Sequence, residues 1–310
     1  MPAPCRPPQE DHAFRTCREP VMPLNRPKDV PEMPVSRLDH RFQTLRAQGR
    51  KALIPFITAG DPSLESTAAV MHGLVDAGAD VIELGVPFSD PMADGPTIQR
   101  SSERALARGA GLRYVLRTVA SFRERDAATP VVLMGYLNPV EIHGYARFAG
   151  EAVAAGVDGV LLVDLPPEEA GEAQQAFEAA GLALVLLASP TTRAPRADTL
   201  LALARGYLYY VSFAGVTGAS ERLDSDAASA RLQALRARAA VPVVAGFGIS
   251  DAGSAVAMAR QADGVVVGSA LVAALAEAGS VDEAVRAAGA FLAPLRQALD
   301  AAGQAAGAGG

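Results

Sequence analysis

The chain has 310 residues, of which 50% are hydrophobic and 20% charged, and its formal net charge at pH 7 is -6. This length allows one large barrel or two modest domains. The acidic balance argues against a nucleic-acid surface, because phosphate binding requires clustered Lys and Arg, and the 28 basic residues here are mostly scattered Arg. Apolar runs are interrupted within about ten residues, well short of the roughly 20 that cross a bilayer, so no membrane span is expected.

Cysteine and histidine offer little chemistry in this chain. Both cysteines, Cys5 and Cys17, lie near the N-terminus, so the rest of the chain has no thiol for catalysis, metal binding or a disulfide. This distribution fits a cytoplasmic location. The four histidines lie without the spacing of metal ligands, and we therefore expect no metal site.

The two ends of the chain differ in composition from its middle. Residues 1–34 are rich in Pro, Arg and charged residues, and cannot bury enough surface to offset the entropy of ordering, so we expect them to be disordered. Two alternatives stay open for this extension: its lack of acidic residues before Glu10 resembles a transit peptide, and translation can begin at Met22 or Met33. Residues 301–310 are rich in Ala and Gly and are expected to form a flexible tail.

Between these ends, short apolar runs alternate with segments of helical spacing. The eight strand-like runs are residues 53–58, 81–85, 131–135, 159–163, 182–187, 207–212, 243–246 and 264–268. Helical spacing follows each run, most clearly in residues 63–77, 139–155, 167–180 and 250–261. Several of these helices end at a glycine just before the next run, as at Gly78, Gly156 and Gly181.

Strands that are buried on both faces and separated by helices form parallel sheets. Eight such units over about 250 residues predict a (β/α)8 TIM barrel, with a parallel eight-stranded core, over residues 35–300. A doubly wound open sheet is the structural alternative. It receives no support from a dinucleotide-binding motif, because Gly246-Phe-Gly248 lacks the third glycine. In a barrel, catalytic groups gather where the strands end and the loops begin.

Two carboxylates fall at the end of the second strand-like run. Glu83 lies inside the apolar run, where a buried carboxylate requires a raised pKa or a closely placed partner. Both conditions are typical of an acid/base catalyst. Asp94 follows in a loop rich in Pro, Gly and Asp, and two carboxylates in different environments can divide the proton transfers. The alternatives are a structural ion pair for Glu83 and a turn-forming role for Asp94.

Glycines near the last strand-like runs predict a phosphate site. Gly246-Phe-Gly-Ile-Ser250 follows the seventh run, and Gly268-Ser-Ala270 follows the eighth at the start of a short helix, residues 270–277. The N-terminus of a helix binds anions through its unpaired amides. The glycine-containing loop of residues 213–220 is long enough to close over a ligand as a lid. Ordinary turn glycines and a loop without function are the alternatives.

Six runs of residues carry a resemblance to a known family. They are Pro55-Phe-Ile-Thr-Ala-Gly-Asp-Pro62, Glu83-Leu-Gly-Val-Pro-Phe-Ser-Asp-Pro91, Ala93-Asp-Gly-Pro-Thr-Ile-Gln99, Gly135-Tyr-Leu-Asn-Pro139, Gly215-Val-Thr-Gly218 and Gly246-Phe-Gly-Ile-Ser250. Together and in this order they resemble the tryptophan synthase alpha chain. The resemblance extends over about residues 35–300.

The resemblance implies a lyase of the EC 4.2.1.20 type, which cleaves indole-3-glycerol phosphate to indole and glyceraldehyde 3-phosphate. This retro-aldol reaction needs no cofactor in the alpha chain. It requires protonation of indole C3, removal of the side-chain hydroxyl proton and stabilisation of positive charge at the ring nitrogen. By this resemblance Glu83 is the general acid/base and Asp94 is the carboxylate beside the indole nitrogen. Each such group typically contributes about 10²- to 10⁴-fold in rate.

The same resemblance implies the substrate contacts. Phe56 and Met134 would line the apolar indole pocket, and Tyr209 would border the acid/base. Thr217 would donate a hydrogen bond to the second carboxylate when the lid closes. The phosphate would be held without a basic side chain, through backbone amides and one hydroxyl, by Gly218, Gly248, Gly268 and Ser269.

Members of this family pair with a beta chain, and an alpha2beta2 tetramer is expected. The beta chain carries pyridoxal phosphate and receives indole through a tunnel. The contact is expected near Pro87, Asp90, Asn138 and Pro139. The chain departs from the family in its N-terminal extension, which has no counterpart that we can match. It also departs at Phe213-Ala214, in a stretch of the lid where a basic residue can occur.

Two other functions stay open at this point. Another phosphate-binding barrel, such as indole-3-glycerol phosphate synthase or a sugar-phosphate isomerase, would require a catalytic Lys or a Cys/Asp pair at the strand ends. Lys51 is the only lysine in the barrel region, and it precedes the first strand-like run. The second alternative is a regulatory subunit that binds the phosphate ligand without catalysis. Such a subunit would not require both Glu83 and Asp94.

Overall fold

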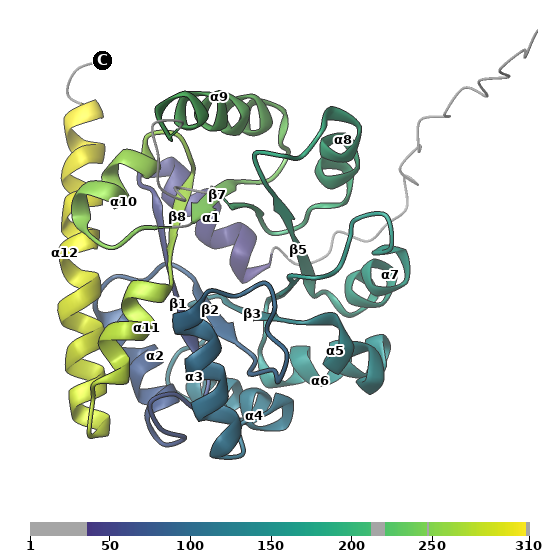
Figure 1. Ribbon diagram of the computed structural model, residues 1–310, viewed down its shortest axis with the longest axis vertical. Helices are drawn as coiled ribbons and strands as arrows, with labels where there is room; N and C mark the ends of the chain where they lie inside the picture. Colours follow the sequence, from purple (N-terminus) through teal and green to yellow (C-terminus); the bar gives the residue numbers. More distant parts are fainter. Residues whose placement is uncertain (1–35, 212–220, 247, 308–310) are drawn as a thin grey trace, which may run out of the picture. The chain divides into compact units, whose positions relative to one another are not determined.

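The computed structural model describes residues 36–211, 221–246 and 248–307 (Figure 1). The extension of residues 1–34 and the predicted lid of residues 213–220 therefore lie outside the described residues, and both expectations stay predictions. None of the described helices is both long and apolar enough to cross a membrane.

A closed barrel of eight parallel strands confirms the predicted TIM barrel. Each strand pairs with the next one in the sequence, and β8 closes the barrel on β1. The strands are β1 Ala52–Thr58, β2 Ile82–Gly85, β3 Val131–Gly135, β4 Gly159–Leu162, β5 Ala183–Ala188, β6 Leu208–Val211, β7 Val243–Gly246 and β8 Gly264–Val267. Every strand begins and ends within one residue of its predicted bounds.

Helices follow the strands and cover most of the outside of the barrel (Figure 1). The described helices are α1 Arg37–Ala47, α2 Ser66–Asp76, α3 Pro96–Ala107, α4 Leu112–Arg123, α5 Leu137–His143, α6 Tyr145–Ala155, α7 Gly171–Ala180, α8 Ala194–Leu203, α9 Glu221–Arg238, α10 Ala252–Ala259, α11 Ser269–Ala276 and α12 Val281–Gly307. The longest, α12, packs on α2, α10 and α11.

Two predicted segments differ from the structure. The helix predicted over residues 139–155 is two helices, α5 and α6, because Gly144 between them has a φ of 87°, which a continuous helix does not allow. Residues 301–307, predicted as part of a flexible tail, continue α12 to Gly307. Alanine has the highest helix propensity, and in this segment it outweighs the glycines.

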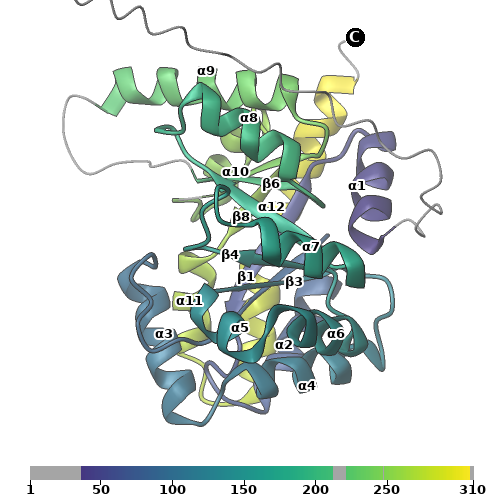
Figure 2. The ribbon, with the colours of Figure 1, turned by 90° about the vertical axis from the view of Figure 1, so that its right-hand side faces the viewer.

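Alternate strand residues point into the barrel or outward to the helices. The inward side chains form one apolar cluster, which contains Ala52, Ile54, Val81, Val132, Leu161, Val185, Tyr207, Val244 and Val266. Helix α1 closes the barrel at the ends where the strands begin, because Leu38 and Phe42 join this cluster. The Phe42 and Tyr207 rings lie 5.7 Å apart between centroids. Figure 2 shows α1 on the side of the strands away from α3 and α11.

Three buried or half-buried aspartates secure the same end of the barrel. Asp80, Asp158 and Asp263 stand just before β2, β4 and β8, and each carboxylate accepts a backbone N–H from the start of the preceding strand. Each is also paired with an arginine, in the ion pairs Arg296–Asp80, Arg123–Asp158 and Arg236–Asp263. Because carboxylates in such positions are stable only when they are paired and hydrogen-bonded, these contacts fix the strand starts and leave the opposite end for function.

Candidate active site at the carboxyl ends of the strands

Glu83 lies on β2 with its side chain inside the barrel. It follows the inward-facing Val81 by two residues, and it is in register with Phe56 on β1 and Val132 on β3. Its exposed fraction is 0%. The strand alternation therefore places an ionisable group among apolar side chains, as the sequence predicted.

The Glu83 carboxyl has one hydrogen-bond partner among the described residues. The Tyr207 hydroxyl donates a hydrogen bond of 2.5 Å to Glu83 Oε1. The buried Oε2 has no partner within the described part of the chain. Glu83 takes part in no ion pair between described residues, so the alternative of a structural ion pair receives no support there.

Burial raises the pKa of Glu83 to about 7, and the hydrogen bond from Tyr207 opposes this rise by stabilising the carboxylate. Near neutral pH, both protonation states of Glu83 are therefore populated. Burial and the neighbouring carboxylate also raise the pKa of Tyr207 well above its ordinary value, so Tyr207 keeps its proton and stays the donor. A carboxyl in this condition can act as both acid and base.

Tyr207 was missed from the sequence, and the resemblance placed only Tyr209 beside Glu83. Tyr209 is also inward-facing and partly buried, and burial and the charge on Glu83 raise its pKa well above its ordinary value. Its hydroxyl, however, lies against Gly246 on β7, where there is no room for a Cβ. The two tyrosines stand two residues apart, so strand alternation was the sequence signal that pointed both of them inward.

Asp94 lies at the end of the loop after β2, directly before the N-cap of α3. The Tyr136 hydroxyl donates a hydrogen bond of 3.1 Å to Asp94 Oδ2 and accepts one of 3.0 Å from the Ala93 N–H. The Tyr136 ring stacks on the ring of Phe88, which lies in the loop after β2 as Asp94 does, with the ring centroids 5.0 Å apart. Burial raises the pKa of Asp94, while the Tyr136 hydrogen bond lowers it. Tyr136, which directly follows β3, thus holds the Asp94 carboxylate at the barrel mouth.

Helix α3, which follows Asp94, is fixed to the loop after β1. Arg104 donates two hydrogen bonds, of 2.8 and 2.7 Å, to the buried carboxylate of Asp61. The Thr58 and Ser101 hydroxyls lie 2.6 Å apart and share a hydrogen bond. A bidentate arginine pair is geometrically specific, so these contacts set the position of the helix that begins beside Asp94.

A narrow cleft at the mouth brings three of the predicted site residues together. Phe56, Met134 and Asp94 line it, whereas Glu83 does not and stands two residues before the lining residue Gly85 on β2. Only about 10 Å³ is free between the lining side chains, which is room for about one water molecule. A bicyclic aromatic ligand can therefore occupy this cleft only after lining side chains rearrange.

The helices after β7 and β8 differ at their N-termini. The Asp251 carboxylate accepts the Ser254 N–H at 2.9 Å in a capping box, which satisfies the first turn of α10. By contrast, α11 begins after Gly268 without a side-chain cap from any described residue, so within the described part of the chain the amides of its first turn, beginning at the exposed Ser269, are available to an anion. Gly248, in the loop after β7, is exposed and has a φ of 68°.

The residues predicted to contact the beta chain differ in solvent exposure. Asp90 and Asn138 are exposed and Pro139 is partly exposed, whereas Pro87 is buried and offers little surface to a partner. Thr217 and Gly218 lie outside the described residues, so their contacts stay predictions. Among the described residues, no group of three or more His, Cys, Asp or Glu could hold a metal ion.

The Glu83→Gln variant tests whether the buried carboxyl titrates near neutrality. The pKa of Glu83 is 4.5 in the unfolded chain but about 7 in the folded one, so the wild type loses stability as pH rises between these values. The difference in free energy of unfolding, Glu83→Gln minus wild type, should therefore increase by about 3 kcal/mol between pH 4 and pH 8. Urea denaturation measures this change. A difference between the two proteins that does not vary with pH would contradict the raised pKa, and the exposed Glu124→Gln is the control.

Comparison with known proteins gives consistent matches. A family model described as tryptophan synthase alpha chain matches residues 42–299. The tryptophan synthase alpha chain of Xanthomonas euvesicatoria pv. vesicatoria (strain 85-10) is 75% identical over 264 residues, which cover 85% of this chain and 98% of that protein. The alpha chain of Xylella fastidiosa (strain M12) is 72% identical over 265 residues, which cover 86% and 98%.

A solved structure agrees with these sequence matches. The crystal structure of tryptophan synthase subunit alpha from Legionella pneumophila str. Paris superposes with a TM-score of 0.80 at 46% identity, over 86% of this chain and 99% of that one. The barrel, the buried carboxyl inside it and the sequence identity all lead to one assignment. This chain belongs to the tryptophan synthase alpha chain family.

Proposed function

We propose that Glu83 is the general acid/base, and Asp94 the carboxylate beside the indole nitrogen, in the cleavage of indole-3-glycerol phosphate that this alpha chain catalyses. The observation that carries the proposal is the Glu83 carboxyl, which is fully buried inside the barrel on β2, two residues before the carboxyl end of that strand, and has a pKa of about 7. Barrel enzymes hold their catalytic groups at this end. A group whose pKa lies near the working pH is well suited to both proton transfers.

The reaction then balances with Glu83 as the only group that exchanges protons. Protonated Glu83 gives its proton to indole C3, which forms the protonated indolenine with positive charge at the ring nitrogen. The Glu83 carboxylate next takes the proton of the side-chain hydroxyl, a carbonyl forms, and the bond to C3 breaks with its electron pair returning to the ring. Indole and glyceraldehyde 3-phosphate leave, and Glu83 is again protonated.

Burial raises the pKa of Asp94, and the hydrogen bond from Tyr136 opposes this rise. Its Oδ2 accepts the Tyr136 hydrogen bond, which favours the ionised form, and its side chain is only partly buried. A fixed negative charge beside the ring nitrogen stabilises the positive charge that develops there. Asp94 is partly buried and Glu83 is fully buried, and this difference in surroundings allows two carboxyl groups in one site to take different roles.

Phe56 and Met134 are proposed as walls of the indole pocket, and Tyr209 as a neighbour of the acid/base. Support comes from the cleft that the first two residues share with Asp94. Because this cleft is nearly filled, we infer that substrate binding moves at least one of the lining side chains. A hydrogen bond from Thr217 to Asp94 stays part of the proposal, and Thr217 lies outside the described residues.

The phosphate is proposed to bind at the N-terminus of α11. The uncapped first turn after Gly268, with the exposed Ser269 hydroxyl, supports this position. Gly248 approaches from the loop after β7 in the proposal, and Gly218 from the loop outside the described residues. Neighbouring α10 is a weaker candidate, since its own capping box already satisfies its first turn.

Membership of the family implies a beta chain as partner. We propose that the two form an alpha2beta2 tetramer in the cytoplasm, with pyridoxal phosphate on the beta chain and no cofactor in this chain. The exposed Asp90 and Asn138 and the partly exposed Pro139, in the loops after β2 and β3, are proposed as contacts. Pro87 is buried, so we propose that it shapes the loop after β2 and does not contact the beta chain directly.

Indole release from indole-3-glycerol phosphate by the chain alone tests these roles. Glu83→Gln and Asp94→Asn should each lower the rate about 10²- to 10⁴-fold, because each removes a group that acts in the transition state. Asp90→Asn, in the same loop as Asp94 but exposed, is the matched control and should stay within about twofold of the wild type. Equal rates for the wild type and folded Glu83→Gln would overturn the assignment.

The Tyr207→Phe variant tests how the acid/base is tuned. Loss of the hydrogen bond removes the contact that lowers the pKa of Glu83, so the inflection in the pH profile of kcat/KM should move to higher pH. Tyr209→Phe leaves that hydrogen bond in place and should produce a smaller shift. An unchanged inflection in Tyr207→Phe, or an equal shift in both variants, would show that the hydrogen bond does not set the pKa.

A further inference from the structure

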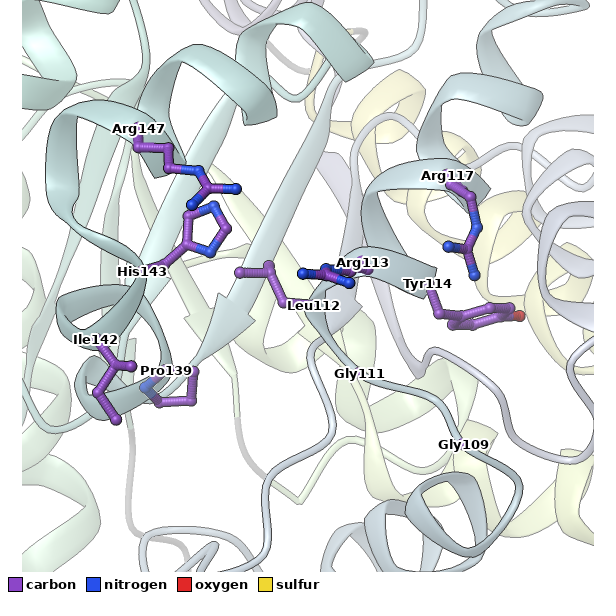
Figure 3. A pocket seen from close by; sticks show the side chains of 10 residues that line it. All are labelled: Gly109, Gly111, Leu112, Arg113, Tyr114, Arg117, Pro139, Ile142, His143 and Arg147. Atoms are coloured by element: carbon purple, nitrogen blue, oxygen red, sulfur yellow. The ribbon is translucent and has the colours of Figure 1, made fainter.

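A hollow of about 530 Å³ lies outside the candidate active site. Its walls come from the turn before α4, from the first turns of α4, and from α5 and the start of α6. Figure 3 shows the side chains of Arg113 and Arg117 on one side of this hollow and those of Ile142, His143 and Arg147 on the other. None of the catalytic or substrate-binding residues proposed above lines it.

The hollow is basic in a chain of net negative charge. Arg113, Arg117, His143 and Arg147 line it, and none of its lining residues is acidic. On the α5–α6 side, His143 and Arg147 share the Glu151 carboxylate, at 2.9 and 2.8 Å.

On the α4 side, Arg113 and Arg117 lie one helical turn apart and are both exposed. Among the described residues neither has a carboxylate within ion-pair distance, as the ion pairs of the described chain include neither of them. This leaves two guanidinium groups available to bind carboxylates, and arginine can do so with two parallel hydrogen bonds.

An exposed apolar side chain stands in the same wall. Ile142 is 80% exposed, although most large hydrophobic residues of the described chain are buried. A small anion would satisfy the arginines but would leave Ile142 in water. A partner protein can cover an apolar side chain while it pairs with the arginines beside it, and arginine is enriched in protein interfaces.

The hollow continues the surface already proposed for the partner. Pro139 belongs to both, since it is one of the proposed beta-chain contacts and it also lines the hollow. It lies in α5, which directly follows the carboxyl end of β3, so this wall belongs to the same end of the barrel as Asp94 in the loop after β2.

We propose that this hollow receives an acidic segment of the beta chain, whose carboxylates pair with Arg113 and Arg117 and whose apolar side chain packs on Ile142. The proposal rests on the proposed function only in that the beta chain docks at the barrel mouth. The proton chemistry of Glu83 does not enter it. Complementary charge at such a site would increase both the rate and the specificity of assembly.

The test measures the Kd between the full alpha chain and the beta chain at low and high salt. The charge-reversal variant Arg113→Glu/Arg117→Glu should raise the Kd about tenfold or more at low salt, and should reduce its salt dependence. Ile142→Asp should also raise the Kd. The conservative variant Arg113→Lys/Arg117→Lys keeps the charge and should retain most of the affinity. The control Arg46→Glu/Arg286→Glu changes two exposed arginines outside the hollow and should leave the Kd unchanged.

Indole release by each alpha-chain variant without the beta chain separates this proposal from the catalytic one. It should stay at the wild-type level in all of these variants, since none of the residues is in the proposed catalytic machinery. An unchanged Kd and salt dependence in folded Arg113→Glu/Arg117→Glu would overturn the docking proposal and leave the roles of Glu83 and Asp94 untouched. Equal weakening by the Arg46→Glu/Arg286→Glu control would also overturn it, because the effect would then be one of overall charge.

Discussion

The desolvation of one carboxyl group, opposed by one hydrogen bond, is the interaction on which the proposed site depends. Glu83 is enclosed by a parallel barrel whose inward side chains are mostly aliphatic, so its charged form is disfavoured. The Tyr207 hydroxyl restores part of the stability of that form. The balance leaves the pKa near 7, where a glutamate can give and take a proton within one reaction cycle.

The fold separates the residues that secure the barrel from those proposed to act. Paired aspartates and helix α1 hold the ends where the strands begin, while the loops after β2 and β3 carry Asp94 and its tyrosine at the other end. The two ends are connected through Tyr207, which packs near Phe42 of α1 and donates to Glu83. Packing at the closed end of the barrel thus helps to position the donor that tunes the acid/base.

Much of the barrel could be predicted from the sequence, because strands buried on both faces appear as short apolar runs bounded by glycines. A single charged residue in such a run, Glu83, was the sequence signal for the candidate site for the same reason. Contacts across the barrel were harder to predict. Tyr207, which donates to Glu83, was not among the predicted residues, because the register of β6 against β2 is set by closure of the whole sheet. The break at Gly144 depended on a backbone conformation that helical spacing does not reveal. The basic hollow combines residues of α4 with residues of α5 and α6, which only the packed structure brings together.

Direct titration of the Glu83 carboxyl in the wild-type chain tests the central claim. The carboxyl carbon of ¹³C-labelled glutamate is followed by NMR over a pH series, and the Glu83 resonance is assigned by its loss in Glu83→Gln. A midpoint near 7 is the result that desolvation inside the barrel predicts. A midpoint near 4.5, the value of an ordinary glutamate, would mean that the charged form is well stabilised and would contradict the proposed acid/base role.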